Sequence, residues 1–177
     1  LKAMEYPGVQ SVQIIFNMFR QRPAELFFGE AAAQDVGVIV RVPLASGLLT
    51  GKFDKQTRFG ADDHRNYNRD GAGFDKGETF AGIPYETGVE AVEAIKSRLS
   101  KSESTASVAL RWILGFDEVS TIIPGASRPE QAVENAAASN RPPLADDLQR
   151  RIREIYARQI KPHVHPLWQV SQPPASG

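Results

Sequence analysis

The sequence predicts an α/β protein in which short parallel strands alternate with helices. Residues 9–16, 38–42 and 119–123 are rich in β-branched side chains and too short for typical helices, so each predicts a strand. The segments between them carry apolar residues at helical spacing. Strands that alternate with helices pair in parallel through right-handed crossovers. The 177 residues are therefore expected to form a single domain with one parallel sheet and outer helices.

The first two strands and the helix between them are delimited by glycine and proline. Apolar residues of 9–16 fall on both faces, as expected for a strand buried on two sides. Pro23 suits the first turn of a helix, whose apolar face is Ala24, Phe27, Phe28 and Ala31. Gly37 ends that helix, and Pro43 closes the strand 38–42 because proline cannot donate within a central strand.

A long loop is expected from about residue 52 to 86. This segment shows no sustained period and is dense in Gly, Asp, Asn and Arg. Structureless loops beyond about 12–15 residues are usually functional lids or disordered. Tyr67, Phe74 and Phe80 favour a lid with aromatic anchors, and disorder is the alternative.

Four helices and the third strand are expected after the long loop. Thr87 with Glu90, and Ser127 with Glu130, match the capping box that opens a helix. Apolar spacing places two more helices around residues 106–113 and 144–155. Residues 9–160 would form the folded unit, and residues 161–177, rich in Pro, His and Gln, are expected to form an irregular tail.

The composition excludes several classes of function. Zero cysteines exclude disulfides and thiolate chemistry, and three histidines leave little room for a histidine metal centre. Packing in the tail is favoured over metal binding for His163 and His165. The formal net charge is zero, so the chain has no overall positive charge to attract nucleic acid or an anionic membrane. No membrane span or signal peptide is recognised, so a cytoplasmic protein is expected.

Arginines gather on one side of the last helix. A solvated face balanced by acidic residues is favoured over nucleic-acid binding for this group. The series comprises Arg150, Arg151, Arg153 and Arg158, with Asp146, Asp147 and Glu154 as the acidic residues.

Two segments suit phosphate binding. In residues 122–135 a strand ends in a turn at Gly125 and feeds a helix start, where free N–H groups and the helix dipole favour anions. Ser127 and Arg128 would add a hydroxyl and a guanidinium; alternatively they are an N-cap and a surface charge. In residues 43–52 two glycines allow a close turn that Lys52 follows, without the order of a P-loop; an ordinary turn is the alternative.

Four sequence blocks together resemble the aldo/keto reductase family. They are V-Q-I-I-F-N, G-V-I-V-R-V-P-L-A-S-G-L-L-T-G-K, A-L-R-W-I-L and I-I-P-G-A-S-R-P-E-Q-A-V-E-N, in the order of that family's C-terminal half. The resemblance spans about residues 9–155 and is closest to the branch with potassium-channel β-subunits and bacterial general-stress reductases. It implies an NADP(H)-dependent oxidoreductase on a (β/α)₈ TIM-type barrel. A complete barrel typically needs about 250 residues, so this chain would be the C-terminal half with strands six to eight.

The resemblance also implies a set of cofactor-binding residues. Gln13 would meet the nicotinamide, residues 43–47 the pyrophosphate, and Lys52 a phosphate. Arg65 is a weaker match to a loop arginine that folds over the cofactor, and residues 125–135 match the adenosine and 2′-phosphate site. The full set is Gln13, Arg41, Pro43, Leu44, Ala45, Ser46, Gly47, Lys52, Arg65, Gly125, Ser127, Arg128, Gln131, Glu134 and Asn135. Arg41 departs from the family, which more often has an aromatic residue there. Its guanidinium would stack on the nicotinamide, redirect the substrate pocket or pair with an acidic group.

No catalytic residue is assigned to this chain. The family's Asp, Tyr, Lys and His lie on the first four strands of the barrel, and Tyr6, Tyr67, Tyr85 and Tyr156 do not occupy strand ends. The parent protein is expected to reduce a small-molecule aldehyde or ketone, and the isolated chain to be inactive. The alternatives are an interaction module, which pairs with itself or with an N-terminal half through exposed sheet edges, and a truncated fragment. A start at Leu1 suggests a piece of a longer protein, and the carbonyl substrate and oligomeric state stay open.

Overall fold

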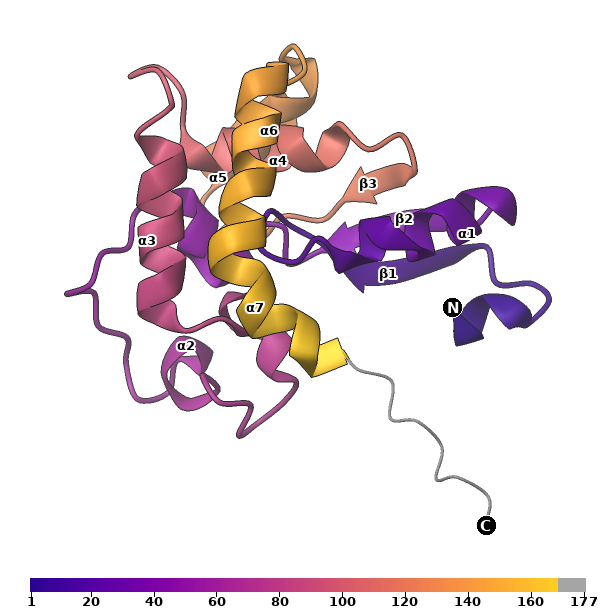
Figure 1. Cartoon of the computed structure of the whole chain (residues 1–177), viewed down its shortest axis with the longest axis horizontal. Helices are drawn as coiled ribbons and strands as arrows, with labels where there is room; N and C mark the ends of the chain where they lie inside the picture. Colours follow the sequence, from indigo (N-terminus) through magenta and orange to yellow (C-terminus); the bar gives the residue numbers. More distant parts are fainter. Residues whose placement is uncertain (169–177) are drawn as a thin grey trace.

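A three-stranded parallel sheet forms the centre of the computed structural model, which describes residues 1–168 (Figure 1). The strands are β1 (Ser11–Ile15), β2 (Gly37–Arg41) and β3 (Val119–Ile122), in that order. β1 and β2 pair without interruption, whereas the β2–β3 register shifts between Val38 and Ile39. The predicted parallel sheet is confirmed; β1 and β3 are shorter than expected, and β2 begins and ends one residue earlier.

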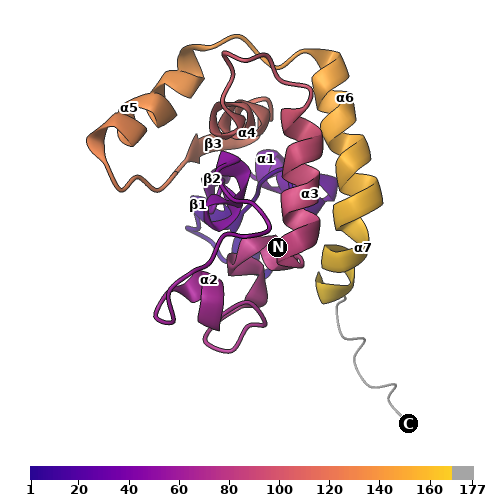
Figure 2. The same cartoon turned by 90° about the vertical axis from the view of Figure 1, so that its left-hand side faces the viewer.

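Helices pack against one face of this sheet, and one long connection joins β2 to α3. In Figure 2, α3 packs alongside α6, while α5 projects on the opposite side of the molecule. The α-helices are α1 (Phe27–Ala33), α2 (His64–Tyr67), α3 (Tyr85–Lys96), α4 (Thr105–Leu114), α5 (Pro129–Ala137), α6 (Asp146–Ile155) and α7 (Lys161–Val164). A π-helical turn, Tyr156–Ile160, joins α6 to α7. Short 3₁₀ turns lie at Lys2–Glu5, Arg22–Glu25, Ala45–Thr50, Lys76–Glu78, Phe80–Gly82, Ala138–Asn140 and His165–Trp168.

The two faces of the sheet differ in burial. Val38 and Val40 of β2 are completely buried. The register places Gln13, Ile39 and Thr121 on the other face, where Gln13 and Thr121 are exposed. The expectation that the first strand is buried on both faces is therefore wrong for the described residues. Parallel sheets are normally covered on both faces, so this face is unusual.

An aromatic cluster forms the centre of the hydrophobic core. Phe16 immediately follows β1 and is completely buried. Its ring centroid lies 4.7 Å from that of Phe28, 5.0 Å from that of Trp112 and 5.0 Å from that of Phe116. These residues connect β1 to α1, to α4 and to the segment that follows α4, so the cluster holds the sheet against its helices.

Both predicted capping boxes are wrong. α3 begins at Tyr85 after Pro84, with no side-chain cap, two residues before Thr87. α5 begins at Pro129 with Arg128 as its N-cap residue, and Ser127 Oγ instead donates to Gln131 Oε1 at 3.0 Å. The physical reason is the same in both places: proline at or beside the first helical position presets the backbone for the helix.

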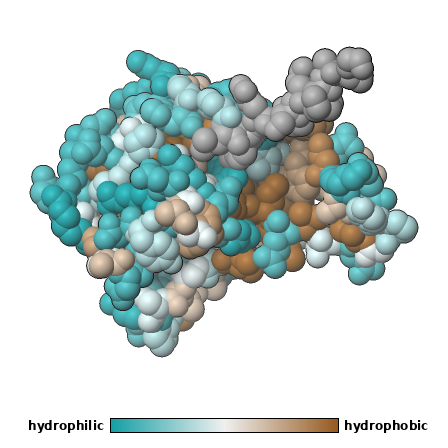
Figure 3. Space-filling view, turned by 90° about the horizontal axis from the view of Figure 1, so that it is seen from below, coloured by the Kyte–Doolittle hydropathy of each residue, from teal (hydrophilic) through white to brown (hydrophobic). Residues whose placement is uncertain are grey.

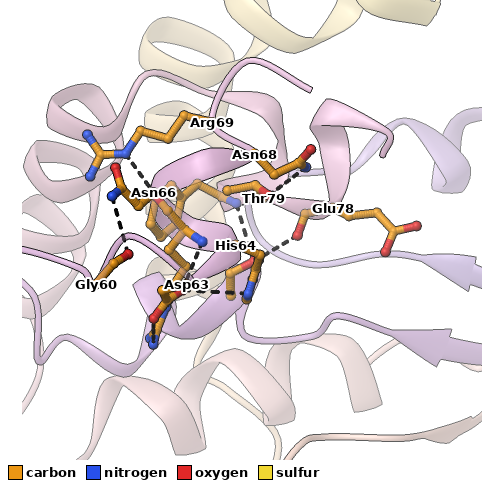
Figure 4. A network of polar contacts seen from close by, with 11 residues as sticks. Gly60, Asp63, His64, Asn66, Asn68, Arg69, Glu78 and Thr79 are labelled. Atoms are coloured by element: carbon orange, nitrogen blue, oxygen red, sulfur yellow. Dashed lines mark hydrogen bonds and ion pairs between the residues drawn. The ribbon is translucent and has the colours of Figure 1, made fainter. Parts of the chain in front are cut away.

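The long loop, which ends at Pro84, is folded around a buried asparagine. Asn68 is completely buried; its Nδ2 donates to Thr79 Oγ1 at 3.0 Å, and its Oδ1 accepts from the N–H groups of Gly73 and Phe74 (Figure 4). Of the three predicted aromatic anchors only Phe80 is buried, since Tyr67 and Phe74 are 48% and 40% exposed. The buried Asn68 therefore orders this loop together with the ring contacts of Phe59 with Phe53 and Phe80.

The expected irregular tail is wrong for residues 161–168, which form α7 and a 3₁₀ turn. Tyr156 Oη lies 2.9 Å from His165 Nε2, and Arg22 Nη1 donates to the His165 carbonyl at 3.2 Å. Val164 is completely buried. These contacts dock the segment on the body of the chain, in agreement with the packing role favoured for His165. Residues 169–177 of the predicted tail lie outside the described residues.

Acidification is expected to destabilise the chain through His165. Burial lowers the pKa of His165 below 6.5; Glu25 raises this pKa, and Lys161 and Arg22 lower it further. Because the unfolded chain takes up a proton at higher pH than the folded chain, the free energy of unfolding falls as pH drops below about 6.5. Urea unfolding at pH 7.5 and 5.5 should show a smaller pH effect in His165→Gln, whose amide oxygen still accepts from Tyr156. An equal pH effect in both proteins would contradict this role.

Candidate functional site

A cleft of about 1000 Å³ lies beyond the carboxyl ends of β2 and β3. Four segments line it: the turn after β2, the long loop, the start of α4, and the turn that leads into α5. Its lining residues are Val42, Pro43, Leu44, Ser46, Gly47, Thr50, Lys52, Phe53, His64, Arg65, Tyr67, Phe74, Glu78, Ser104, Ala106, Gly125, Ala126, Ser127, Gln131, Glu134 and Asn135. Segments more than 70 residues apart in sequence thus meet at one place.

Most residues of the predicted set line this cleft. Those that do so are Pro43, Leu44, Ser46, Gly47, Lys52, Arg65, Gly125, Ser127, Gln131, Glu134 and Asn135. Four others do not line it. Gln13 lies on the exposed face of β1, Ala45 is completely buried, Arg128 is exposed at the start of α5, and Arg41 is held at the end of β2.

The turn after β2 has an unusual backbone. Val42, Ala45 and Ser46 have φ angles of 52°, 47° and 57°, in the left-handed region that L residues rarely adopt. Completely buried Asn17 donates from Nδ2 to the Val42 carbonyl at 3.0 Å and fixes the start of this turn. Gly47 follows with φ 91°, and a Cβ there would lie 3.1 Å from the Phe53 ring. Such strain persists only where the surroundings determine the conformation, and it clusters at ligand sites.

The Ser46 hydroxyl holds the long loop. Its Oγ donates to the Glu78 carbonyl at 2.7 Å and accepts from the Phe80 N–H at 3.4 Å. Ser46 therefore contributes its backbone, more than its hydroxyl, to the cleft.

Arg41 pairs with Glu78 of the long loop. Its Nη1 and Nη2 lie 3.1 Å and 2.8 Å from the two carboxylate oxygens, and both side chains are about one third exposed. The hydrogen bonds from Arg41 are the largest cause that lowers the pKa of Glu78. Of the three roles open for Arg41, pairing with an acidic group is the one observed. Stacking on a nicotinamide stays a prediction.

Two basic side chains of the long loop face the cleft. Lys52 is exposed, and within residues 1–168 its ammonium has no ion pair. Arg65 is bound to Asp63, and its Nη1 lies 3.9 Å from the position that a Cβ would take on Gly47. The weak match of Arg65 to a loop arginine thus coincides with a position beside the Gly47 turn.

The start of α5 carries donors that converge on a single oxygen. The N–H and the Oγ of Ser127 both donate to Gln131 Oε1, at 2.8 Å and 3.0 Å. Asn135, one turn further on, donates from Nδ2 to the Gly125 carbonyl at 3.3 Å. This donor pair lies at the positive end of the α5 dipole and suits a phosphate oxygen in place of the glutamine oxygen. The residues present therefore fit an anionic ligand.

Several residues of the site were missed by sequence reasoning. Glu78 and Asn68 lie in a segment without periodicity, and their partners are distant in sequence. Asp63 precedes Arg65 by two residues and could have been found from that spacing. No signal distinguished His64, Phe53 or the start of α4 as part of the cleft.

Within residues 1–168, no helix is long and apolar enough to cross a membrane, and no three acidic or histidine side chains group as metal ligands do. Among the tyrosines, Tyr67 lines the cleft with an exposed ring, whereas Tyr156 is buried and its pKa is raised to about 12, chiefly by burial.

A parallel sheet whose strand ends open into a cleft is characteristic of the α/β enzymes, barrels and open sheets alike. Within that class the comparison is specific: the aldo/keto reductase family model matches residues 1–157. The chain belongs to the aldo/keto reductase family. The resemblance seen in the four sequence blocks is thereby confirmed.

The curated relatives include a bacterial reductase and a plant potassium-channel subunit. L-glyceraldehyde 3-phosphate reductase from Escherichia coli K12 is 34% identical over 106 residues, which cover 59% of this chain and 29% of that protein. A probable voltage-gated potassium channel subunit beta from Oryza sativa subsp. japonica is 29% identical over 135 residues, or 73% of this chain and 38% of that one. The chain thus spans well under half the length of these relatives.

Solved structures agree on the fold. A glycerol dehydrogenase from Gluconobacter oxydans superimposes with a TM-score of 0.67 at 25% identity, over 85% of this chain and 43% of that chain. The holo form of an aldo-keto reductase from Bacillus halodurans gives a TM-score of 0.61 at 19% identity, over 87% and 45% of the two chains. The family and these structures imply a (β/α)₈ barrel, to which the parallel sheet and helices correspond.

Proposed function

We propose that this chain is the cofactor-binding half of an NADP(H)-dependent reductase that converts aldehydes or ketones to alcohols. The main support for this proposal is the cleft, which brings together residues 43–52, Arg65 and residues 125–135 at the strand ends. NADPH supplies the hydride in such a reaction. Membership of the aldo/keto reductase family supports the reaction class, and the donor set at Ser127 supports a phosphate-bearing cofactor.

Each segment of the cleft has a part in this proposal. The backbone of residues 43–47 lies along the pyrophosphate, with Lys52 and Arg65 on the phosphates. Ser127 and Arg128 hold the 2′-phosphate once Gln131 releases Ser127. Gln131 and Asn135 are four residues apart, so they meet the adenine from one face of α5. Glu134 and Gly125 complete the adenosine site, and Gln13 and Arg41 stand at the nicotinamide end.

The proposal includes that the chain supplies strands six to eight of the barrel, as β1, β2 and β3. The exposed face of the sheet, with Gln13 and Thr121, then becomes the inside of the barrel. The family's catalytic Asp, Tyr, Lys and His belong to the preceding strands. The isolated chain is therefore expected to show no steady turnover of a generic aldehyde with NADPH, and measurable turnover would contradict this division of roles. A cytoplasmic location, consistent with the absence of cysteine, is part of the same proposal.

The exposed sheet face also favours a second candidate, an interaction module. Ile123, which follows β3, is 48% exposed, and β1 and β3 are the edge strands of the described sheet. Figure 3 shows apolar side chains in a hollow on the side seen from below Figure 1, where β1 is the lowest strand. Unpaired edges and apolar surface invite pairing with a second copy or with a separate N-terminal half. A monomeric mass in light scattering, unchanged when an N-terminal half is added, would remove this candidate.

Fluorescence titration of the 177-residue chain with NADPH and NADH tests the cofactor. We expect NADPH to bind about tenfold more tightly, because a charged hydrogen bond to the extra phosphate is worth about 1.5–3 kcal/mol. Arg128→Ala should remove most of that preference. Arg141→Ala, which removes an exposed arginine beyond the other end of α5, serves as the matched control. Equal affinities for the two dinucleotides, or no binding of either, would contradict the proposal.

A further inference from the structure

Asp63 and Arg65 form a closed pair within the long loop. Nε of Arg65 lies 2.9 Å and 3.1 Å from the two carboxylate oxygens of Asp63, and Nη2 lies 2.5 Å from Oδ2 (Figure 4 labels Asp63). The same carboxylate accepts the Arg65 N–H at 2.9 Å as the N-cap of α2. These hydrogen bonds lower the pKa of Asp63 to about 2 and raise that of Arg65, so both groups are charged at neutral pH.

Two aromatic rings lie close to the same guanidinium. The Arg65 Cζ lies 4.7 Å from the Phe59 ring centroid and 5.6 Å from that of Phe53. A guanidinium that is hydrogen-bonded along one edge and lies against aromatic rings is restricted in its orientation. Its remaining donors therefore point in a limited range of directions.

The remaining nitrogen of Arg65 is the one nearest the cleft. Nη1 makes no hydrogen bond to any of residues 1–168, and it lies 3.9 Å from the Cβ position of Gly47. Gly47 and Arg65 both line the cleft. Nε and Nη2 of Arg65 thus face Asp63 in the loop, whereas Nη1 faces the strained turn after β2.

We infer that Asp63 is a positioning residue, which sets the Arg65 guanidinium so that Nη1 donates to the phosphates of the bound dinucleotide beside Gly47. Asp63 itself touches no ligand in this arrangement. The inference rests on the proposed cofactor site and adds to it a residue outside the predicted set. It also explains why the Asp63 carboxylate lies near the proposed phosphate site, since its negative charge is paired with the Arg65 guanidinium.

Other charges around the pair do not replace Asp63. Asp62 is exposed and has no hydrogen bond to Arg65. His64 Nδ1 lies 3.7 Å from Asp63 Oδ1, on the same carboxylate. Glu78 is engaged by Arg41. Asp63 is thus the acidic group that orients Arg65.

Asp63→Asn separates positioning from helix capping, since asparagine caps a helix as well as aspartate does but turns an N–H₂ group toward the guanidinium. Asp62→Asn removes the same charge one residue away and is the matched control. We expect Asp63→Asn to weaken NADPH binding about tenfold and Asp62→Asn to change it less than twofold, as found for residues that orient a ligand-binding group. In an Arg65→Ala background the Asp63→Asn effect should disappear.

The arginine side chain provides a readout that needs no cofactor. In ¹⁵N NMR spectra of the unliganded chain, the Arg65 Nη2 hydrogens should be protected from exchange by Asp63 Oδ2, and Asp63→Asn, which places an N–H₂ group at that position, should abolish this protection. Unchanged or tighter NADPH binding in Asp63→Asn, or an effect that persists without Arg65, would overturn the inference. If the unaltered chain binds no NADPH, the proposed function fails. The NMR result then decides separately whether Asp63 holds the guanidinium, and continued protection in Asp63→Asn overturns that too.

Discussion

Phe16→Ala is expected to lower the free energy of unfolding by about 3–5 kcal/mol, as truncation of a buried phenylalanine does in other cores. Phe16 is completely buried and packs against Phe28, Trp112 and Phe116. Its removal deletes contacts to α1, to α4 and to Phe116 in the segment after α4, and it leaves a cavity that rigid neighbours cannot fill. Because domains of this kind have about 5–15 kcal/mol in total, the loss is a large share of the stability.

Urea unfolding followed by far-ultraviolet circular dichroism measures this loss. Phe74→Ala is the control, since it removes the same side chain at a position that is 40% exposed. Phe16→Leu refills much of the volume and should recover part of the stability. A loss in Phe16→Ala that is no larger than in Phe74→Ala would show that the aromatic cluster is not the centre of the core.

Glu103→Ala should lower the free energy of unfolding by about 2–3 kcal/mol, because it leaves the buried Arg111 guanidinium without a carboxylate. Arg111 is 9% exposed, and its Nη1 lies 2.5 Å from Glu103 Oε1. Its Nε and Nη2 donate to the carbonyls of Pro142 and Pro143 at 3.0 Å and 3.4 Å. Arg111 thus connects α4, whose first turn lines the cleft, to the segment before α6, and Glu103 neutralises its charge.

The Glu103 side chain is 26% exposed, so the expected loss is set below that of a fully buried pair. Glu93→Ala breaks an exposed pair with Lys96 on α3 and should change the stability by less than about 0.5 kcal/mol. The same urea titration compares the two variants. Equal losses would mean that Arg111 is satisfied without Glu103.

The sequence predicted the sheet well because its signals are local. Gly37 and Pro43 bracket β2, which runs from Gly37 to Arg41. The helix starts were misplaced because proline at the helix entry outweighs a capping box. The folded long loop and the helical residues 161–168 depend on Asn68 with Thr79 and on Tyr156 with His165. Those contacts join residues 11 and 9 positions apart in irregular segments, where periodicity carries no information.

The candidate site was predictable where it follows a motif and not where it depends on tertiary contacts. The turn at Gly47 and the start of α5 were expected, and both line the cleft. The pair of Arg41 and Glu78 spans 37 residues and joins a strand end to the long loop, so nothing in the local sequence revealed it. The burial of Ala45 likewise depends on how the strained turn packs.

Mapping the bound cofactor tests the central claim most directly. In ¹H–¹⁵N NMR spectra recorded during NADPH addition, the account predicts the largest amide shifts at Gly47, Ser127 and Asn135, which line the cleft from both sides. Saturable shifts confined to residues outside this cleft, such as Arg58 and Thr87, would contradict it.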